Sequence, residues 1–214
     1  DGAQDHDIIL RAVDRMMGED RHAARRAKLP IAHIPKVLYH WRCYEGSTSE
    51  NPESKRYAYE AGKRAVEDFL KAREYQADVV HTCHLGFFRV NYQPDLLSNR
   101  PDVAVVGGKL IDRHNRVVGG IYNENREPLY LGLHREYSGY MHRASCQQEA
   151  YAVDVRCMIC SGEAQTVWEE LTGLPYAVQP HTGYFLYQDV LKKDADYEEL
   201  SFRFCEELRR RGKR

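Results

Sequence analysis

The chain has 214 residues, of which 43% are hydrophobic and 29% are charged, and this composition suits a globular protein of one large or two small domains. Its 31 basic and 32 acidic side chains give a net charge of -1 without a basic stripe, which argues against nucleic-acid binding. No uncharged apolar run approaches the roughly 18 residues of a membrane span, and the first residues are not a signal peptide. Because the chain does not begin with Met, we expect it to be part of a longer protein.

The first predicted element is a helix over residues 4–17. Its apolar residues recur at helical spacing, so we expect one buried face. That stripe consists of Ile8, Ile9, Ala12, Val13, Met16 and Met17.

A strand-like alternation follows over residues 31–42, with a bend or a sheet edge at Pro35. His40 and Arg42 are two residues apart and therefore lie on one face of this predicted strand. A loop rich in Gly, Ser and Thr comes next, and it precedes a second predicted helix over residues 51–75. The pair Asn-Pro at the start of that helix supplies a cap and a favoured first residue.

The composition becomes β-rich near residue 77, and we place a boundary there between residues 1–77 and residues 78–214. In the second unit the Tyr-rich residues 122–148 are predicted to form a loop or lid, and helices are predicted over residues 163–171 and 197–211. Since helices and strands interleave throughout, the expected class is α/β. Predicted strands cover residues 78–84, 86–92, 102–111, 117–121 and 151–160.

Two glycine pairs, Gly107-Gly108 and Gly119-Gly120, raise the possibility of a phosphate-binding loop. Neither pair satisfies the GxGxxG or the Walker spacing. We interpret both as kinks or bulges in strands.

The six cysteines are scattered along a chain of moderate size, which argues against a disulfide scaffold and favours a reducing compartment. Cys157 and Cys160 form a CxxC pair that could hold zinc or exchange disulfides. A zinc site would need a second such pair, and a redox site would need a strand-to-helix setting. We therefore favour a strand with half-buried thiols, and a structural role is likewise favoured for the run His81-Thr82-Cys83-His84.

Three motifs of the first unit occur in an order that points to a known family. They are DGAQDHDIILR at residues 1–11, HIPKVLYHWR at residues 33–42 and GSTS at residues 46–49. Together they closely resemble the C-terminal part of family 2 glycosyltransferases, of the bacterial type that builds rhamnan-like and other surface polysaccharides. This resemblance covers residues 1 to about 75.

The second unit resembles a degenerate copy of such a domain. GFFRVNY at residues 86–92 looks like a lead-in, and later landmarks follow at residues 105–110, 155–160 and 171–175. The few residues between Tyr92 and Pro101 leave no room for the nucleotide-binding strands and the acidic metal motif. At residues 200–205, where the family carries its acidic pair, Ser201 occupies a carboxylate position.

The resemblance implies a partial nucleotide-diphospho-sugar transferase (GT-A-like) fold with a mixed sheet and flanking helices. It also implies a nucleotide-sugar donor, a glycan acceptor of the cell envelope, and a divalent metal (Mn or Mg) in the intact parent enzyme. No metal is expected to bind tightly to this chain alone. The expected location is the cytoplasm, with a membrane-associated assembly at the inner face as an alternative.

Asp5 is the candidate catalytic base, because a carboxylate at the start of a helix can take the proton of an attacking sugar hydroxyl. The same residue could instead act as a helix cap or dipole partner. His40 and Arg42 could meet the negative charge of the departing diphosphate, or they could be a structural histidine and a surface ion pair. The resemblance adds Ser47 and Thr48 to this donor side.

Three functions remain open from the sequence. The leading one is a fragment of an inverting sugar transferase that is inactive alone. Its alternatives are a non-catalytic interaction module of a multidomain glycosyltransferase and a zinc or thiol-redox protein built on Cys157 and Cys160.

Overall fold

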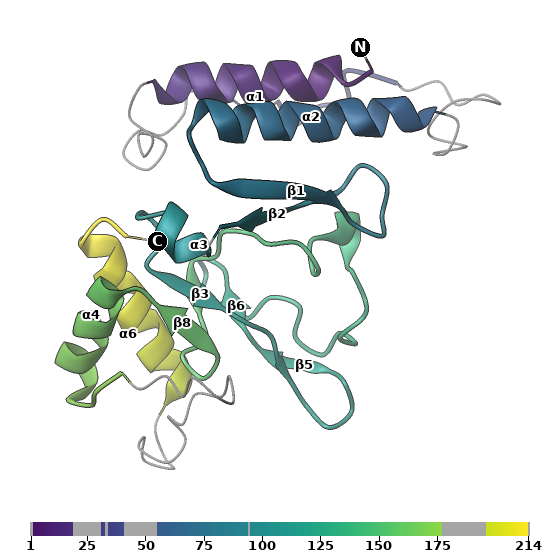
Figure 1. Cartoon of the computed structure of the whole chain (residues 1–214). Coiled ribbons are helices and arrows are strands. Elements are labelled where there is room, and N and C mark those ends of the chain that lie inside the picture. The colour runs from purple at the N-terminus through teal and green to yellow at the C-terminus, as the bar shows by residue number, and fades with distance from the viewer. Residues whose placement is uncertain are drawn as a thin grey trace. The chain divides into compact units, whose positions relative to one another are not determined.

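The computed structural model describes residues 2–18, 31–32, 34–40, 55–93, 95–176 and 196–213 (Figure 1). The chain divides into two compact units, Asp1–Asn99 and Arg100–Arg214, and each is considered by itself. This division falls later than the boundary expected at residue 77. The difference arises because the β-hairpin that follows residue 77 packs against the preceding helix.

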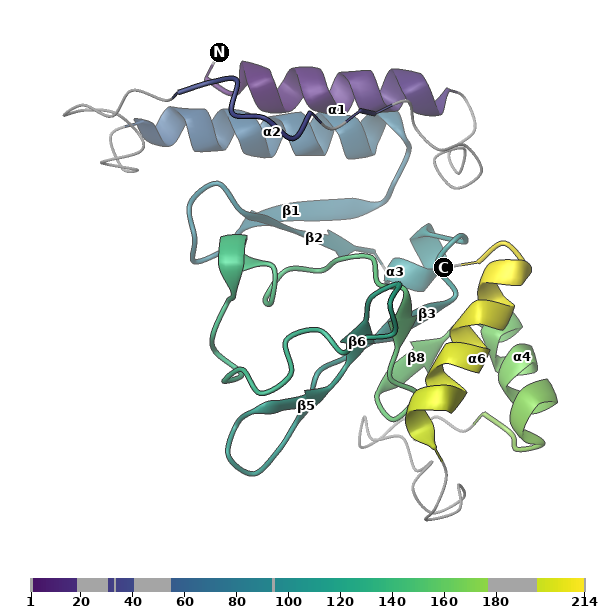
Figure 2. The ribbon, with the colours of Figure 1, turned by 180° about the vertical axis from the view of Figure 1, so that it is seen from behind.

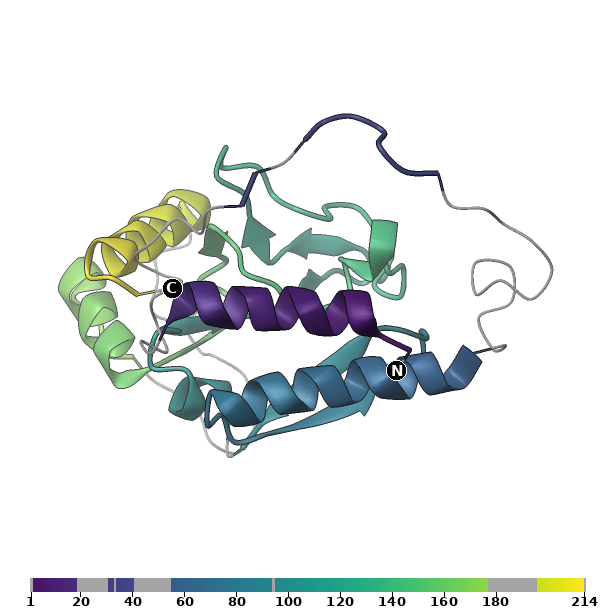
Figure 3. The same ribbon diagram turned by 90° about the horizontal axis from the view of Figure 1, so that it is seen from above.

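The first unit consists of two helices beside a hairpin. Helices α1 and α2 lie side by side, and α2 packs against strand β1 (Figures 1 and 3). Strands β1 and β2 pair antiparallel, with Val79 opposite Val90. Their bounds are α1 Gln4–Met17, α2 Arg56–Ala72, β1 Ala77–His81, β2 Phe88–Tyr92 and the short α3 Leu96–Asn99.

Helix α1 forms where it was predicted, but its expected buried face is wrong. Ile8 is 66% exposed and Ile9 is 60% exposed, and no described residue of α1 is buried. The half-buried positions include His6, Leu10, Val13 and Met17, which recur at helical spacing and form a narrower stripe. A single neighbouring helix covers only such a stripe, so the remaining apolar residues of α1 face outward.

The strand expected over residues 31–42 is wrong for the part that the structure describes. Residues 31–32 and 34–40 are irregular, and Val37 and Tyr39 are 79% and 76% exposed. Alternation alone does not make a strand, because the backbone also needs a neighbouring strand with which to exchange hydrogen bonds. No described segment pairs with these residues.

In the second unit, helix α4 packs beside helix α6 and strand β8 (Figure 2), and α6 also packs against strand β7. Its core lies between these elements and contains the fully buried Trp168, Phe204 and Val167. Both helices follow the prediction to within about one residue. The elements are β3 Val105–Gly107, β4 Leu110–Ile111, β5 Val117–Gly119, β6 Ile121–Tyr122, a 3-10 turn Tyr140–His142, β7 Ala152–Val153, β8 Met158–Cys160, α4 Gly162–Thr172 and α6 Tyr197–Arg210.

The protein is therefore a mixed α/β structure, but the single mixed sheet that was expected is not found in the described residues. Four separate two-stranded antiparallel sheets take its place. The expected strands at 102–111 and 151–160 are each divided into two short strands. In the second case the buried Asp154 carboxylate accepts a hydrogen bond from the Arg156 backbone N–H (3.0 Å), and this turns the chain.

Glycines allow the close packing of these short strands. A Cβ atom at Gly107 would lie 2.6 Å from the Val153 Cβ, and one at Gly119 would lie 2.6 Å from an Asp154 carboxylate oxygen. The pairing of β4 with β5 also shifts register beside Leu110. The register shift confirms a bulge beside Gly119, whereas Gly107 pairs with Met158 in regular register at the end of β3.

We expect the substitution Gly107→Ala to lower the free energy of unfolding by about 1–3 kcal/mol, because the new methyl group overpacks against Val153. Urea denaturation followed by tryptophan fluorescence measures the change. Gly162→Ala is the matched control, since a Cβ atom there meets nothing within 4 Å. Equal stability of the two variants would contradict this explanation.

Among the described helices, none combines the length and the apolar character needed to cross a membrane.

Candidate functional site

The candidate base Asp5 lies in the first turn of α1, which is fixed against α2. At Gly2, with φ +104°, a Cβ atom would lie 2.9 Å from the Tyr57 ring and 3.1 Å from the Cα atom of Ala58. The Asp7 backbone N–H then donates to the Ala3 carbonyl (3.0 Å) and begins the helix. The start of α1 therefore lies in close contact with the start of α2.

Two further contacts fix α1 along its length. The His6 ring stacks on Phe88 of β2 with 6.1 Å between centroids, and a Cβ atom at Gly62 of α2 would lie 3.4 Å from the His6 Nδ1 atom. Near the other end, the buried Arg73 donates through Nε to an Asp14 carboxylate oxygen at 2.5 Å. Residues 2, 6 and 14 of the first segment thus contact residues 57, 62 and 73 in turn. Because both sets of numbers increase together, the two helices run in the same direction.

The two carboxylates in this first turn differ in their surroundings. Asp7 accepts from the Arg11 Nε atom at 2.9 Å, an ion pair one helical turn apart. Asp5 is exposed, and its carboxylate makes no hydrogen bond or ion pair with another described residue. Asp5 is thus accessible to a substrate hydroxyl.

The donor-side candidates are only partly within the described structure. His40 is exposed in the irregular segment 34–40. Arg42, Ser47 and Thr48 lie outside the described residues. Binding of the diphosphate by these residues therefore stays a prediction.

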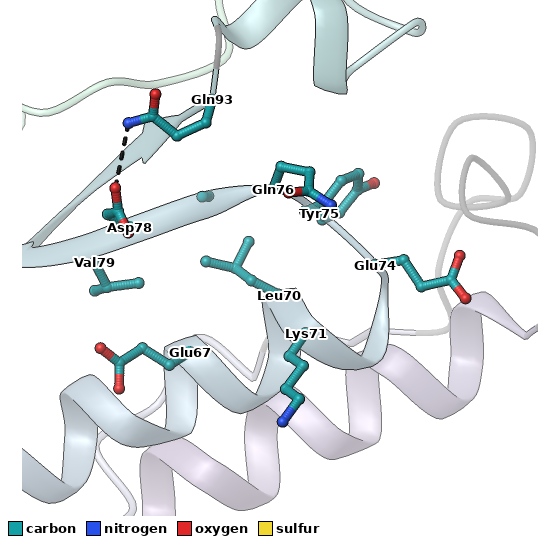
Figure 4. Close-up of a pocket in the computed structure, with 10 residues that line it drawn as sticks. Glu67, Leu70, Lys71, Glu74, Tyr75, Gln76, Asp78, Val79 and Gln93 are labelled. Carbon is teal, nitrogen blue, oxygen red and sulfur yellow. Dashed lines mark hydrogen bonds between the residues drawn. The ribbon is translucent and has the colours of Figure 1, made fainter.

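An open hollow of about 520 Å³ lies between the end of α2 and the hairpin (Figure 4). Leu70 of α2 and Val79 of β1 are its buried apolar residues, and the Gln93 amide donates to the Asp78 carboxylate at 3.2 Å. Asp5 does not line it. Sequence reasoning missed this hollow because it results from packing between elements and carries no motif. The lining residues are Glu67, Leu70, Lys71, Glu74, Tyr75, Gln76, Ala77, Asp78, Val79 and Gln93.

In the second unit, Ser201 is fully buried within α6. Its hydroxyl donates to the Tyr197 carbonyl at 2.6 Å and accepts from the Val155 backbone N–H at 3.1 Å. The first hydrogen bond lies within α6, and the second joins α6 to the segment before β8. The position that resembles a family carboxylate is therefore structural here.

One arginine binds two of the carboxylates of α6. Arg126 donates to Glu199 at 3.1 Å and to Glu206 at 2.8 Å, and its guanidinium lies 4.7 Å from the centroid of the Phe202 ring. Hydrogen bonding from Arg126 is the main cause that lowers the pKa of Glu206. Glu199 and Glu206 thus hold the 123–127 turn against the helix.

Of the cysteine pair, Cys160 is buried and Cys157 is half-buried. Burial raises the pKa of Cys160 to about 12, and burial also raises the pKa of Cys205 to about 11. A thiol that stays protonated at neutral pH is a poor nucleophile and a poor metal ligand. The described residues contain no group of three His, Cys, Asp or Glu side chains that could hold a metal ion.

His81, from the run of residues 81–84, lies 2.9 Å from the Glu60 carboxylate and packs edge to face with the Phe88 ring.

Comparison with known proteins gives one significant relative among curated proteins. The uncharacterized protein y4gI of Sinorhizobium fredii (strain NBRC 101917 / NGR234) is 44% identical to the chain over 70 residues, which is 33% of the chain. The matched part spans about 7% of the length of that relative. No family model matches the chain, and no solved structure matches it.

Proposed function

We propose that the first unit is the later part of an inverting glycosyltransferase domain with a GT-A-like fold, and that Asp5 is its general base. The observation that carries this proposal is the difference between the two carboxylates at the start of α1. Asp7 forms an ion pair with Arg11. Asp5, in contrast, is exposed in the first turn of a helix that packs closely against α2. A base must be both accessible and well positioned.

In the proposed reaction, a hydroxyl oxygen of the acceptor glycan attacks the anomeric carbon of a nucleotide sugar. Asp5 takes the proton of that hydroxyl as the new C–O bond forms. The bond from the anomeric carbon to the diphosphate oxygen breaks with its electron pair, and the nucleoside diphosphate leaves. Attack opposite to the leaving group inverts the anomeric configuration, and the base contributes on the order of 10²–10⁴ in rate.

The departing diphosphate needs positive charge nearby. His40 and Arg42, with Ser47 and Thr48 in the following loop, are the residues that we assign to it. A divalent metal belongs to the family that the sequence resembles, but the described residues do not provide a group that fits one. No step of the reaction proposed here depends on such an ion.

The outward side of α1 supports a larger catalytic domain. Ile8 and Ile9, one turn after Asp5, are 66% and 60% exposed. Met16, farther along the helix, is 38% exposed. Exposed apolar side chains that share one side of a helix are typical of surfaces covered by another protein segment. We assign that cover to the donor-binding half of the same domain. The far greater length of the relative is consistent with this assignment.

For the second unit we propose a non-catalytic role within the same protein. Ser201 cannot accept a proton at neutral pH, and it is buried. Glu199 and Glu206 are engaged by Arg126. These contacts favour the interaction-module alternative for residues 100–214, while the transferase proposal applies to the first unit.

The test uses the natural protein that contains residues 1–214, incubated with a panel of nucleotide sugars, Mn²⁺ and an acceptor glycan. We expect release of nucleoside diphosphate that depends on the acceptor and on one sugar donor. The absence of acceptor-dependent release with every donor, from protein shown to be folded by circular dichroism, would contradict the proposal.

The isolated 214-residue chain is expected to bind nucleotide sugars only weakly, because His40 and Arg42 offer a partial cationic edge without a nucleoside pocket. Titration calorimetry with the same donors and Mn²⁺ should give a Kd weaker than about 10 μM, which corresponds to roughly 7 kcal/mol. Tighter binding would show that the chain already contains a complete donor site.

A further inference from the structure

The long connection between β6 and β7 is ordered although it contains little regular structure. Its part from residue 129 to residue 149, here named the tyrosine loop, has only the 3-10 turn Tyr140–His142. The Leu129 N–H donates to Ile121 O at 2.9 Å, and the Arg135 N–H donates to Asn115 O at 2.7 Å. Connections of this length inside a compact unit are uncommon, and they usually serve recognition.

The backbone of the tyrosine loop holds bulky residues in a conformation that they rarely adopt. Tyr130, Met141 and His142 have φ angles of 64°, 51° and 56°. Each such residue costs on the order of 1–3 kcal/mol and persists only where surrounding contacts impose it. Because three such residues occur in one loop, we infer that the shape of the loop serves a function.

Internal contacts impose this shape. The Gln148 amide donates to the Tyr130 hydroxyl at 3.0 Å and to the Arg143 carbonyl at 2.7 Å. The Ala144 N–H donates to Ser138 O at 2.8 Å, and its side chain is buried under Gly139. The loop therefore presents its remaining side chains from a preformed scaffold, which reduces the entropy lost on binding.

The side chains that the tyrosine loop presents are apolar and aromatic. Tyr140 is 83% exposed, Tyr137 is 57% exposed, and Leu131 and Met141 are 55% and 58% exposed. Tyrosine offers a large, rigid contact surface with a polar edge, which suits it to recognition. In the described part of the second unit, the other exposed large apolar side chains are Val118 and Ile159.

We propose that the tyrosine loop binds a neutral glycan chain, with pyranose rings stacked on Tyr137 and Tyr140. A sugar ring has a face of C–H groups that matches an aromatic face, and its hydroxyl groups can bond to the polar side chains of the same loop. The two arginines, Arg135 and Arg143, are balanced by Glu136 and Glu149, so the loop has no excess positive charge for nucleic acid or an anionic membrane.

This glycan site rests on the proposed function, because it makes the second unit the part that binds the acceptor glycan of the proposed transfer reaction. A unit without a catalytic carboxylate can still hold the acceptor chain on the same polypeptide as the transferase unit. Holding the acceptor raises its effective concentration at a neighbouring active site. The site is therefore distinct from the reaction centre at Asp5.

The experiment titrates the 214-residue chain with neutral oligosaccharides of glucose, mannose and rhamnose, followed by saturation-transfer difference NMR. We expect saturable binding of at least one oligosaccharide with a Kd tighter than about 1 mM. Tyr140→Ala should weaken this binding about tenfold, whereas Tyr140→Phe should preserve it, because stacking requires the ring and not the hydroxyl.

Ile159→Ala is the control, since Ile159 is 53% exposed in the same unit outside the tyrosine loop and should leave the binding unchanged. No saturable binding, equal binding by Tyr140→Ala, or a preference for sulfated over neutral oligosaccharides would each overturn the glycan site. Acceptor-dependent transfer by the natural protein without such binding would leave the transferase proposal intact. The two proposals can therefore fail separately.

Discussion

Replacing Ser201 by Asp is expected to unfold the second unit rather than to restore a catalytic carboxylate. Ser201 is fully buried, and its hydroxyl both donates to the Tyr197 carbonyl and accepts from the Val155 N–H. A carboxylate cannot donate to the Tyr197 carbonyl oxygen, and the neighbouring Arg156 is already paired with Asp154 at 2.6 Å. We expect the free energy of unfolding to fall by about 3–5 kcal/mol, as for other uncompensated buried charges.

Urea denaturation of the 214-residue chain measures this effect, and Ser201→Ala is its control. The alanine variant removes the hydroxyl and leaves the buried Val155 N–H without its partner, at a cost of about 1–3 kcal/mol. Both variants remain without transfer activity of their own if the unit is not catalytic. A Ser201→Asp variant as stable as the original chain would show that the α6 core tolerates the carboxylate.

The substitution Asp5→Asn in the natural protein should lower sugar transfer at least about a hundredfold, the low end for loss of a general base. The amide keeps the shape and the exposure of Asp5 but accepts a proton poorly. Because Asp5 is exposed, stability should change by no more than about 0.5 kcal/mol. Initial rates at saturating donor separate this effect on kcat from any effect on binding.

The matched control is Asp7→Asn, the same chemical change two residues along the same helix turn. It removes an exposed i,i+4 ion pair with Arg11, which stabilises a helix by only about 0.3–0.5 kcal/mol. Transfer should therefore stay within a few-fold of the original rate. Equal losses in the two variants would return Asp5 to a role as a first-turn helix charge.

Helices with strong end signals could be predicted from the sequence. In α4 the Ser161 hydroxyl accepts from the Ala164 N–H, and Gly173 ends the helix in the left-handed conformation with φ 71°. In α6 the Asp196 side chain accepts from the N–H groups of Glu198 and Glu199. These contacts are local, so they depend on neighbouring residues that the sequence displays directly.

Features that depend on distant partners could not be predicted in the same way. The spacing of Ile8 and Ile9 shows that α1 is amphipathic but not which side α2 covers. The alternation at 151–160 continues through Asp154, although that carboxylate turns the chain by bonding to Arg156. Of the candidate site, the sequence indicates Asp5 through its motif, whereas the order and exposure of the tyrosine loop follow from long-range contacts.

The anomeric configuration of the product tests the central claim most directly. The natural protein that contains this chain would be supplied with its nucleotide-sugar donor and acceptor, and the one-bond coupling at the new anomeric carbon would be measured by NMR. Single displacement with Asp5 as base predicts a product of inverted configuration that forms from the original protein and at least about a hundredfold more slowly from Asp5→Asn. A product of retained configuration, or one formed equally fast by both proteins, would contradict it.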